Sequence, residues 1–208
     1  MNRWMTLVAV VFVMGFPAVA LAHPGHGAGD HGVSEHAMGG FSNGLTHPLT
    51  GIDHVLTLIA VALIAVRIGG RAIWGVPAAF LAMGVVGASA ASLGWTVPMA
   101  EAMIIGSVLI AGLTLLSRRT APTFLLSVIC GFGIFHGYAH MIEMASTATI
   151  ASYAAGLMTT SLGLIAVVMI AARSGQRFGS TETFAKACHV VGGSLTAVAI
   201  AMMLVHVG

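Results

Sequence analysis

Two short stretches place histidine and carboxylate side chains beside long apolar runs. One is HPLTGIDH, residues 47–54, and the other is FHGYAHMIE, residues 135–143. Ionisable side chains are costly in lipid, so those found within membrane segments are functional candidates by default. Neutral imidazole together with carboxylate suits a borderline dication such as Ni²⁺, Co²⁺ or Zn²⁺, whereas Mg²⁺ prefers oxygen ligands alone. The two stretches therefore predict a site for a transition-metal dication.

The second stretch has the spacing of one helix face. His136, His140 and Glu143 stand at positions i, i+4 and i+7, which lie on the same side of an α-helix. We therefore predict that all three bind the metal. The alternative is that such side chains hydrogen-bond between helices or cap helix ends.

The first stretch contributes two more histidines and one carboxylate. His47 and His54 are seven residues apart, so we expect them to share a face of one helix that has Pro48 in its first turn. Asp53 points about a quarter turn away from His54. It could bind the metal directly, or it could accept a hydrogen bond that holds a histidine ring.

Auxiliary ligands are expected elsewhere in the chain. Residues 23–44 are rich in Gly and His without any apolar period, so we expect a flexible segment. Its histidines could trap a dication loosely, or the segment could be a spacer. Glu101 either joins the main site or sits at the membrane interface. These auxiliary candidates are His23, His26, His31, His36 and Glu101.

The composition indicates a membrane protein. Of 208 residues, 58% are hydrophobic and 7% are charged, whereas a soluble domain has about a quarter charged residues. The net charge of +2 is too small to suggest a nucleic-acid partner. Each apolar run is long enough to cross a bilayer as a helix, which predicts an all-α, six-transmembrane-helix bundle over residues 45–208. The predicted spans are 48–67, 74–94, 97–117, 122–143, 149–172 and 184–207.

The two ends of the mature chain are predicted to lie outside. Residues 1–22 combine Arg3, an apolar core and the cleavage-site pattern Ala20-Leu21-Ala22, so they read as a cleaved signal peptide. An uncleaved first membrane helix is the alternative. All later basic residues fall at the connections after spans one, three and five, which are then cytoplasmic. This topology places both motifs on the outer side of the membrane.

The two motifs resemble those of the HupE/UreJ family of small bacterial nickel permeases. HPLTGIDH matches the family pattern HPxxGxDH, and FHGYAHMIE matches FHGxAHxxE. The resemblance implies uptake of Ni²⁺ or Co²⁺ across the bacterial inner membrane, with delivery to hydrogenase or urease maturation proteins. The outer side is then the periplasm, where the charge pattern predicts both ends of the mature chain. It implies the same metal-contacting residues, namely His47, Asp53, His54, His136, His140 and Glu143.

The expected mechanism is secondary transport rather than catalysis. The chain has no Walker A sequence, so it does not hydrolyse ATP by that route. We expect no enzyme activity and no resident cofactor, only a transported ion. The alternatives are an intramembrane zinc-dependent hydrolase, a haem protein with axial histidines, and a metal-sensing or delivery protein. Six helices are few for a large pathway, which leaves a homo-oligomer open.

Overall fold

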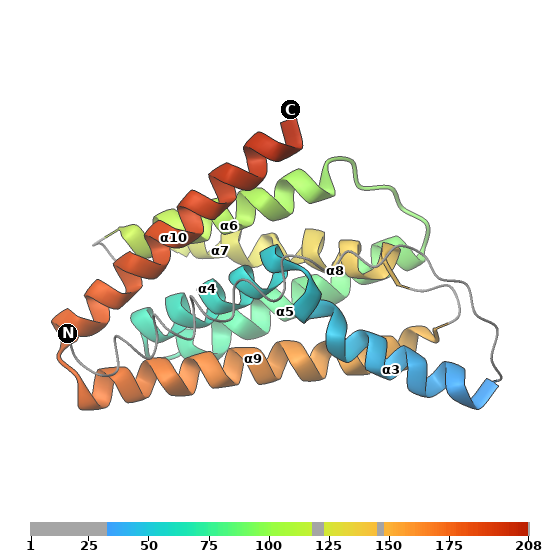
Figure 1. Cartoon of the computed structure of the whole chain (residues 1–208), viewed down its shortest axis with the longest axis horizontal. Helices are drawn as coiled ribbons and strands as arrows, with labels where there is room; N and C mark the ends of the chain where they lie inside the picture. The colour runs from blue at the N-terminus through green and yellow to red at the C-terminus, as the bar shows by residue number, and fades with distance from the viewer. Residues whose placement is uncertain (1–32, 118–122, 145–147, 208) are drawn as a thin grey trace. The chain divides into compact units, whose positions relative to one another are not determined.

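The computed structural model describes residues 33–117, 123–144 and 148–207, with backbone alone for 33–39 and 207 (Figure 1). Within these ranges all the regular secondary structure is helical, which confirms the predicted all-α class. The predicted signal peptide, His23, His26 and His31 lie outside the described residues. The helices are α3 (Val33–Thr50), α4 (Ile52–Ile68), α5 (Ala72–Ser92), α6 (Ala100–Leu116), α7 (Thr123–Gly131), α8 (Gly133–Ile142), α9 (Ile150–Phe178) and α10 (Thr181–Val207).

The described helices include several that are long and apolar enough to cross a membrane. Four qualify directly, namely α5, α7 with α8 as one span over Thr123–Ile142, α9 and α10. The bent pair α3 and α4 would make a fifth. Helix α6 has 17 residues, about 26 Å at 1.5 Å per residue, against a hydrocarbon core of about 30 Å. The chain is therefore a multi-pass membrane protein, and the predicted sixth span stays a prediction.

The predicted first span is broken at the motif it was expected to contain. Helices α3 and α4 meet at Gly51 with a bend of 77°, so His47 and His54 belong to different helices. The expectation of a shared helix face, with Pro48 in a first turn, is therefore wrong; Pro48 lies near the end of α3. Gly51 favours the break because glycine loses much conformational freedom in a helix. At the end of α3, the Thr50 hydroxyl donates to the His47 carbonyl oxygen at 2.8 Å, so this carbonyl keeps a partner although the helix stops.

The chain divides into two compact units, which helices α4 and α9 both enter. Unit 1 comprises Met1–Val55 and Met144–Gly163, and unit 2 comprises Leu56–Glu143 and Leu164–Gly208. The two motifs therefore fall into different units.

In unit 1, glycines serve helix packing rather than flexibility. Residues 33–44 were expected to be flexible, but they form the first part of α3. A Cβ atom on Gly44 would overlap the Tyr153 carbonyl oxygen, and one on Gly156 would overlap that of Phe41. The two backbones therefore lie in direct contact, and small residues are what such close approach needs. The expectation of a flexible segment is wrong for residues 33–44.

In unit 2, two helix pairs meet through glycine. Helix α8 packs along α5, where a Cβ atom on Gly137 would overlap the Gly84 carbonyl oxygen. Helix α10 packs along α6, where a Cβ atom on Gly192 would lie 2.8 Å from the Gly112 carbonyl oxygen. Gly133, one turn before Gly137, likewise leaves no room for a side chain against the Phe80 backbone, so α8 approaches α5 along a face of small residues.

Arg67 ties the end of α4 to the end of α6. Its Nη1 atom donates to the carbonyl oxygens of Thr114 and Leu115, each at 3.0 Å, and Nη2 donates to that of Ser117. The last carbonyls of a helix have no partner within the helix, and a guanidinium group satisfies several of them at once. Helix α4 is thereby held beside α6 in unit 2.

Candidate metal site

The first motif is built around a carboxylate that holds a histidine ring. Asp53 Oδ1 accepts hydrogen bonds from the backbone N–H and the ring Nδ1 of His54, both at 2.9 Å. The His54 side chain is 7% exposed, and that of Asp53 is 17% exposed. A proton on Nδ1 leaves the lone pair on Nε2, which is then the nitrogen able to bind a metal. Of the two roles considered for Asp53, the described geometry fits the one that orients a ring.

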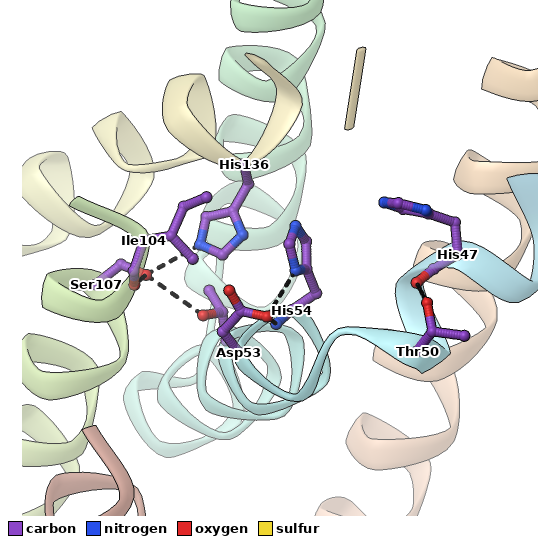
Figure 2. A network of polar contacts seen from close by, with 8 residues as sticks. His47, Thr50, Asp53, His54, Ile104, Ser107 and His136 are labelled. Atoms are coloured by element: carbon purple, nitrogen blue, oxygen red, sulfur yellow. Dashed lines mark hydrogen bonds and ion pairs between the residues drawn. The ribbon is translucent and has the colours of Figure 1, made fainter. Parts of the chain in front are cut away.

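The bend at Gly51 places His47 beside this pair. The ring centroids of His47 and His54 are 6.1 Å apart, and the rings meet edge to face at 74° (Figure 2). The His47 ring also contacts Tyr153 of α9 at 5.8 Å. His47 and His54 thus come together across a helix break rather than along one face. Sequence reasoning did not find Tyr153, because nothing in the sequence relates it to residue 47.

The second motif buries its two histidines. His136 and His140 lie one turn apart in α8 and are 4% and 8% exposed. Glu143 follows the last residue of α8, and its backbone N–H still bonds to the Ala139 carbonyl oxygen at 3.0 Å. The Glu143 side chain is exposed. The helical spacing expected of the three residues is present, with the carboxylate at the helix end.

His136 is surrounded by residues that sequence reasoning missed. Its Nε2 atom lies 3.0 Å from Ser107 Oγ, and its ring lies 5.4 Å from that of Phe80. Ser107 Oγ also contacts the Ile104 carbonyl oxygen at 2.6 Å and Thr57 Oγ1 at 3.4 Å. The available signal was a serine and a threonine within apolar spans, which are common in membrane helices as packing residues.

The remaining candidates with described residues are Glu101 and His36. Glu101 Oε1 is 3.7 Å from His206 Nδ1, and the Glu101 side chain is 74% exposed, which fits the interfacial alternative. His36 lies in residues 33–39 of α3, for which the backbone alone is described.

Among the described residues, no three His, Cys, Asp or Glu side chains form a group that could hold a metal ion as placed. Unit 1 supplies His47, Asp53 and His54, whereas His136, His140 and Glu143 come from unit 2. The single site formed by both motifs stays a prediction.

Comparison with known proteins places both motifs in a recognised family. The family model described as HupE / UreJ protein matches residues 11–202, a range that includes both motifs. The chain is 29% identical to Protein HupE of Rhizobium leguminosarum bv. viciae over 203 residues, which cover 97% of this chain and 99% of that protein. No solved structure matches the chain. With the family pattern spanning nearly its whole length, the chain belongs to the HupE/UreJ family.

Proposed function

We propose that this protein is a secondary transporter that takes up a transition-metal dication across the bacterial inner membrane, with Ni²⁺ preferred over Co²⁺. The observation that carries the proposal is the Asp53–His54 pair. A carboxylate that accepts the Nδ1–H of a buried imidazole fixes the ring orientation and makes Nε2 the nitrogen that can bind a metal, as it does in many metal sites. Membership of the HupE/UreJ family supports the same reading.

The helix break at Gly51 also supports transport. Interrupted membrane helices in transporters line the site where the cargo ion binds, because free backbone groups are tolerated there. In the proposed cycle, His47 and His54 take the ion from the outer side and replace part of its water shell. His136 and His140 complete the ligand set, with Glu143 at the outer edge. A rearrangement of the helices then opens the site inward.

The membrane potential would drive this movement. An inside-negative potential favours inward transfer of a dication by about 4.6 kcal/mol per 100 mV. The ion leaves chemically unchanged, so the protein would not be an enzyme. The proposal includes periplasmic chain ends and a supply of metal to hydrogenase or urease maturation proteins. The histidines of residues 23–36 would act as a loose trap for scarce metal.

The test is uptake of radiolabelled Ni²⁺ into proteoliposomes with an imposed potential. We expect accumulation that depends on the protein and the potential, with Co²⁺ competing more strongly than Zn²⁺. His54→Gln should abolish it, whereas His206→Gln, at an exposed histidine of α10, should not. Binding of Ni²⁺ without accumulation would instead indicate a sensor or delivery protein. Zinc-dependent hydrolysis without accumulation would indicate the intramembrane hydrolase.

A further inference from the structure

The end of α3 is tied to α9 by a hydrogen bond within unit 1. Thr160 of α9 donates from Oγ1 to the Leu45 carbonyl oxygen at 2.7 Å, the usual length of an O–H···O bond. The two residues are 115 positions apart in the chain, and the bond is partly buried. Leu45 precedes His47 by two residues. The Thr160 side chain therefore holds the backbone directly before a histidine of the first motif.

Pro48 explains why this part of α3 uses a donor from another helix. Pro48 lies inside α3 and has no N–H group, so the helix lacks the bond that residue 48 would make to the Gly44 carbonyl oxygen. The proline is also fully buried, with less than 2% of its surface exposed. In membrane helices, hydroxyl groups of neighbouring helices supply donors where proline interrupts the backbone bonds. The bond from Thr160, at the carbonyl next to that of Gly44, is an arrangement of this kind.

Helix α9 contacts the same part of α3 in two further ways. A Cβ atom on Gly44 would overlap the Tyr153 carbonyl oxygen, so the two backbones touch. The Tyr153 ring, which is 2% exposed, meets the His47 ring edge to face, with centroids 5.8 Å apart and planes at 64°. Tyr153 and Thr160 are seven residues apart and so lie on one face of α9. This face therefore contacts both the backbone that carries His47 and the imidazole itself.

The break at Gly51 makes such support important. Helices α3 and α4 meet at 77°, so the last turn of α3 does not continue straight into the next helix. The residues at a helix end lack part of the backbone hydrogen bonding that holds the helix interior. His47 lies in that last turn. The bond from Thr160 thus acts on the part of α3 that its own helix holds least.

We propose that Thr160 is a positioning residue for the transport site, which holds the end of α3 so that His47 meets the cation in a fixed direction. The inference rests on the proposed function, in which His47 takes the ion from the outer side. Thr160 acts through α3 and is not itself a ligand. A histidine that moves freely has to lose that freedom on binding a metal, which weakens binding. A ring whose backbone and packing are fixed in advance avoids this loss.

The chain offers a matched control next to Thr160. Thr159 Oγ1 donates to the Ala155 carbonyl oxygen, also at 2.7 Å, but this acceptor belongs to α9 itself. Replacing either threonine by valine removes one hydroxyl group and keeps a β-branched side chain of similar shape. The two variants therefore differ in whether the lost hydrogen bond joins α9 to α3.

The first test measures the hold on α3 in the absence of metal. Amide hydrogen exchange of the full-length protein in detergent, followed by mass spectrometry, reports local opening of a helix. We expect residues 45–50 to exchange faster in Thr160→Val than in the wild-type protein or in Thr159→Val. Equal exchange of this segment in all three proteins would overturn the inference.

The second test measures Ni²⁺ uptake into proteoliposomes. Thr160→Val should raise the apparent KM about 10-fold, the lower end of the range for residues behind a metal ligand, with a smaller change in maximal rate. The two constants separate because a poorly held His47 weakens capture of the ion, which saturating metal overcomes. Thr160→Ser keeps the hydroxyl and should have a KM close to that of the wild-type protein. Thr159→Val should leave KM unchanged.

Two results of the uptake assay would contradict the role of Thr160. An equal rise in KM for Thr159→Val and Thr160→Val would show that any lost hydroxyl on α9 has this effect, whether or not its bond reaches α3. A loss of maximal rate at unchanged KM in Thr160→Val would place the residue outside the capture of the ion.

The two tests also separate this inference from the proposed function. Ni²⁺ uptake with a wild-type KM in Thr160→Val would refute the inference and leave the function standing. An absence of Ni²⁺ uptake by the wild-type protein would refute the function, while the exchange measurement would still decide whether Thr160 holds α3. If Thr160→Val does not insert into the membrane, Thr160→Ala takes its place, because it removes the same hydroxyl group without placing a methyl group at the Leu45 carbonyl.

Discussion

Asp53 Oδ1 lies 2.9 Å from both the backbone nitrogen and the ring Nδ1 of His54. One carboxylate oxygen thus fixes the start of α4 and the orientation of a buried imidazole together. Neighbouring residues in a helix do not normally face each other. The contact forms here because the pair stands in the first turn of α4, directly after the break at Gly51.

Replacing Asp53 by Asn should weaken metal binding while leaving the fold intact. The amide can still accept a hydrogen bond, but it lacks the negative charge that strengthens the bond from His54 Nδ1. We expect the apparent affinity for Ni²⁺ in uptake assays to fall about 10- to 100-fold. Glu182→Gln is the control, because it removes an exposed carboxylate paired with Lys186 at 2.7 Å. Equal effects of the two variants would contradict the role given to Asp53.

Replacing Gly51 by Ala should disturb the same pair by steric contact. A Cβ atom at residue 51 would lie 2.7 Å from His54 Nδ1 and 3.0 Å from Asp53 Oδ1, so the ring or the carboxylate has to move. We expect strong loss of Ni²⁺ uptake with normal membrane insertion. Gly75→Ala is the matched control, because a Cβ atom there meets nothing within 4 Å. Full uptake by Gly51→Ala would show that the described geometry is not the one that transports.

Replacing Gly137 by Ala should destabilise the packing of α8 on α5. The added methyl group would overlap the Gly84 carbonyl oxygen, and overpacking of this kind costs about 1–3 kcal/mol. The measurement is thermal unfolding in detergent, with Gly131→Ala as control, since residue 131 has open space around its Cα atom. A Gly137→Ala protein as stable as the control would argue against direct backbone contact.

The predicted orientation can be tested with single cysteines. In a background without Cys130 and Cys188, a cysteine at Thr96 should react with an impermeant thiol reagent added to intact cells once the outer membrane is permeabilised. A cysteine at Gly70 should react only after the inner membrane is opened, because the connection that follows α4 is predicted to be cytoplasmic. Labelling at Gly70 from outside would reverse the topology and place the first motif on the inner side.

The sequence predicted the features that depend on local pattern. Composition and apolar runs predict membrane helices, and the i, i+4 spacing of His136 and His140 holds in α8. The break at Gly51 was not predictable in this way, because one glycine in an apolar run is equally typical of close helix packing. Residues 33–44 were wrongly predicted to be flexible for the same reason, because glycines that allow close helix packing cannot be told from linker glycines in the sequence.

The contacts of Ser107 with Thr57 and His136 were out of reach for a different reason. His136 comes 29 residues after Ser107 in the chain, and Thr57 comes 50 residues before it. No periodicity connects such positions. The hydrogen bonds exist only because the packing of α4, α6 and α8 in unit 2 places these side chains in one buried region.

The break at Gly51 has an electrostatic consequence. Every helix carries about half a positive charge at its first turn and about half a negative charge at its last, from peptide groups that lack partners. His47 lies in the last turn of α3, and Asp53 lies in the first turn of α4. The Asp53 carboxylate therefore lies at the positive end of α4, and His47 lies at the negative end of α3, which attracts a cation. A straight helix through residues 47–54 would have no helix end here. The break at Gly51 therefore creates the negative helix end beside His47 that attracts a metal dication.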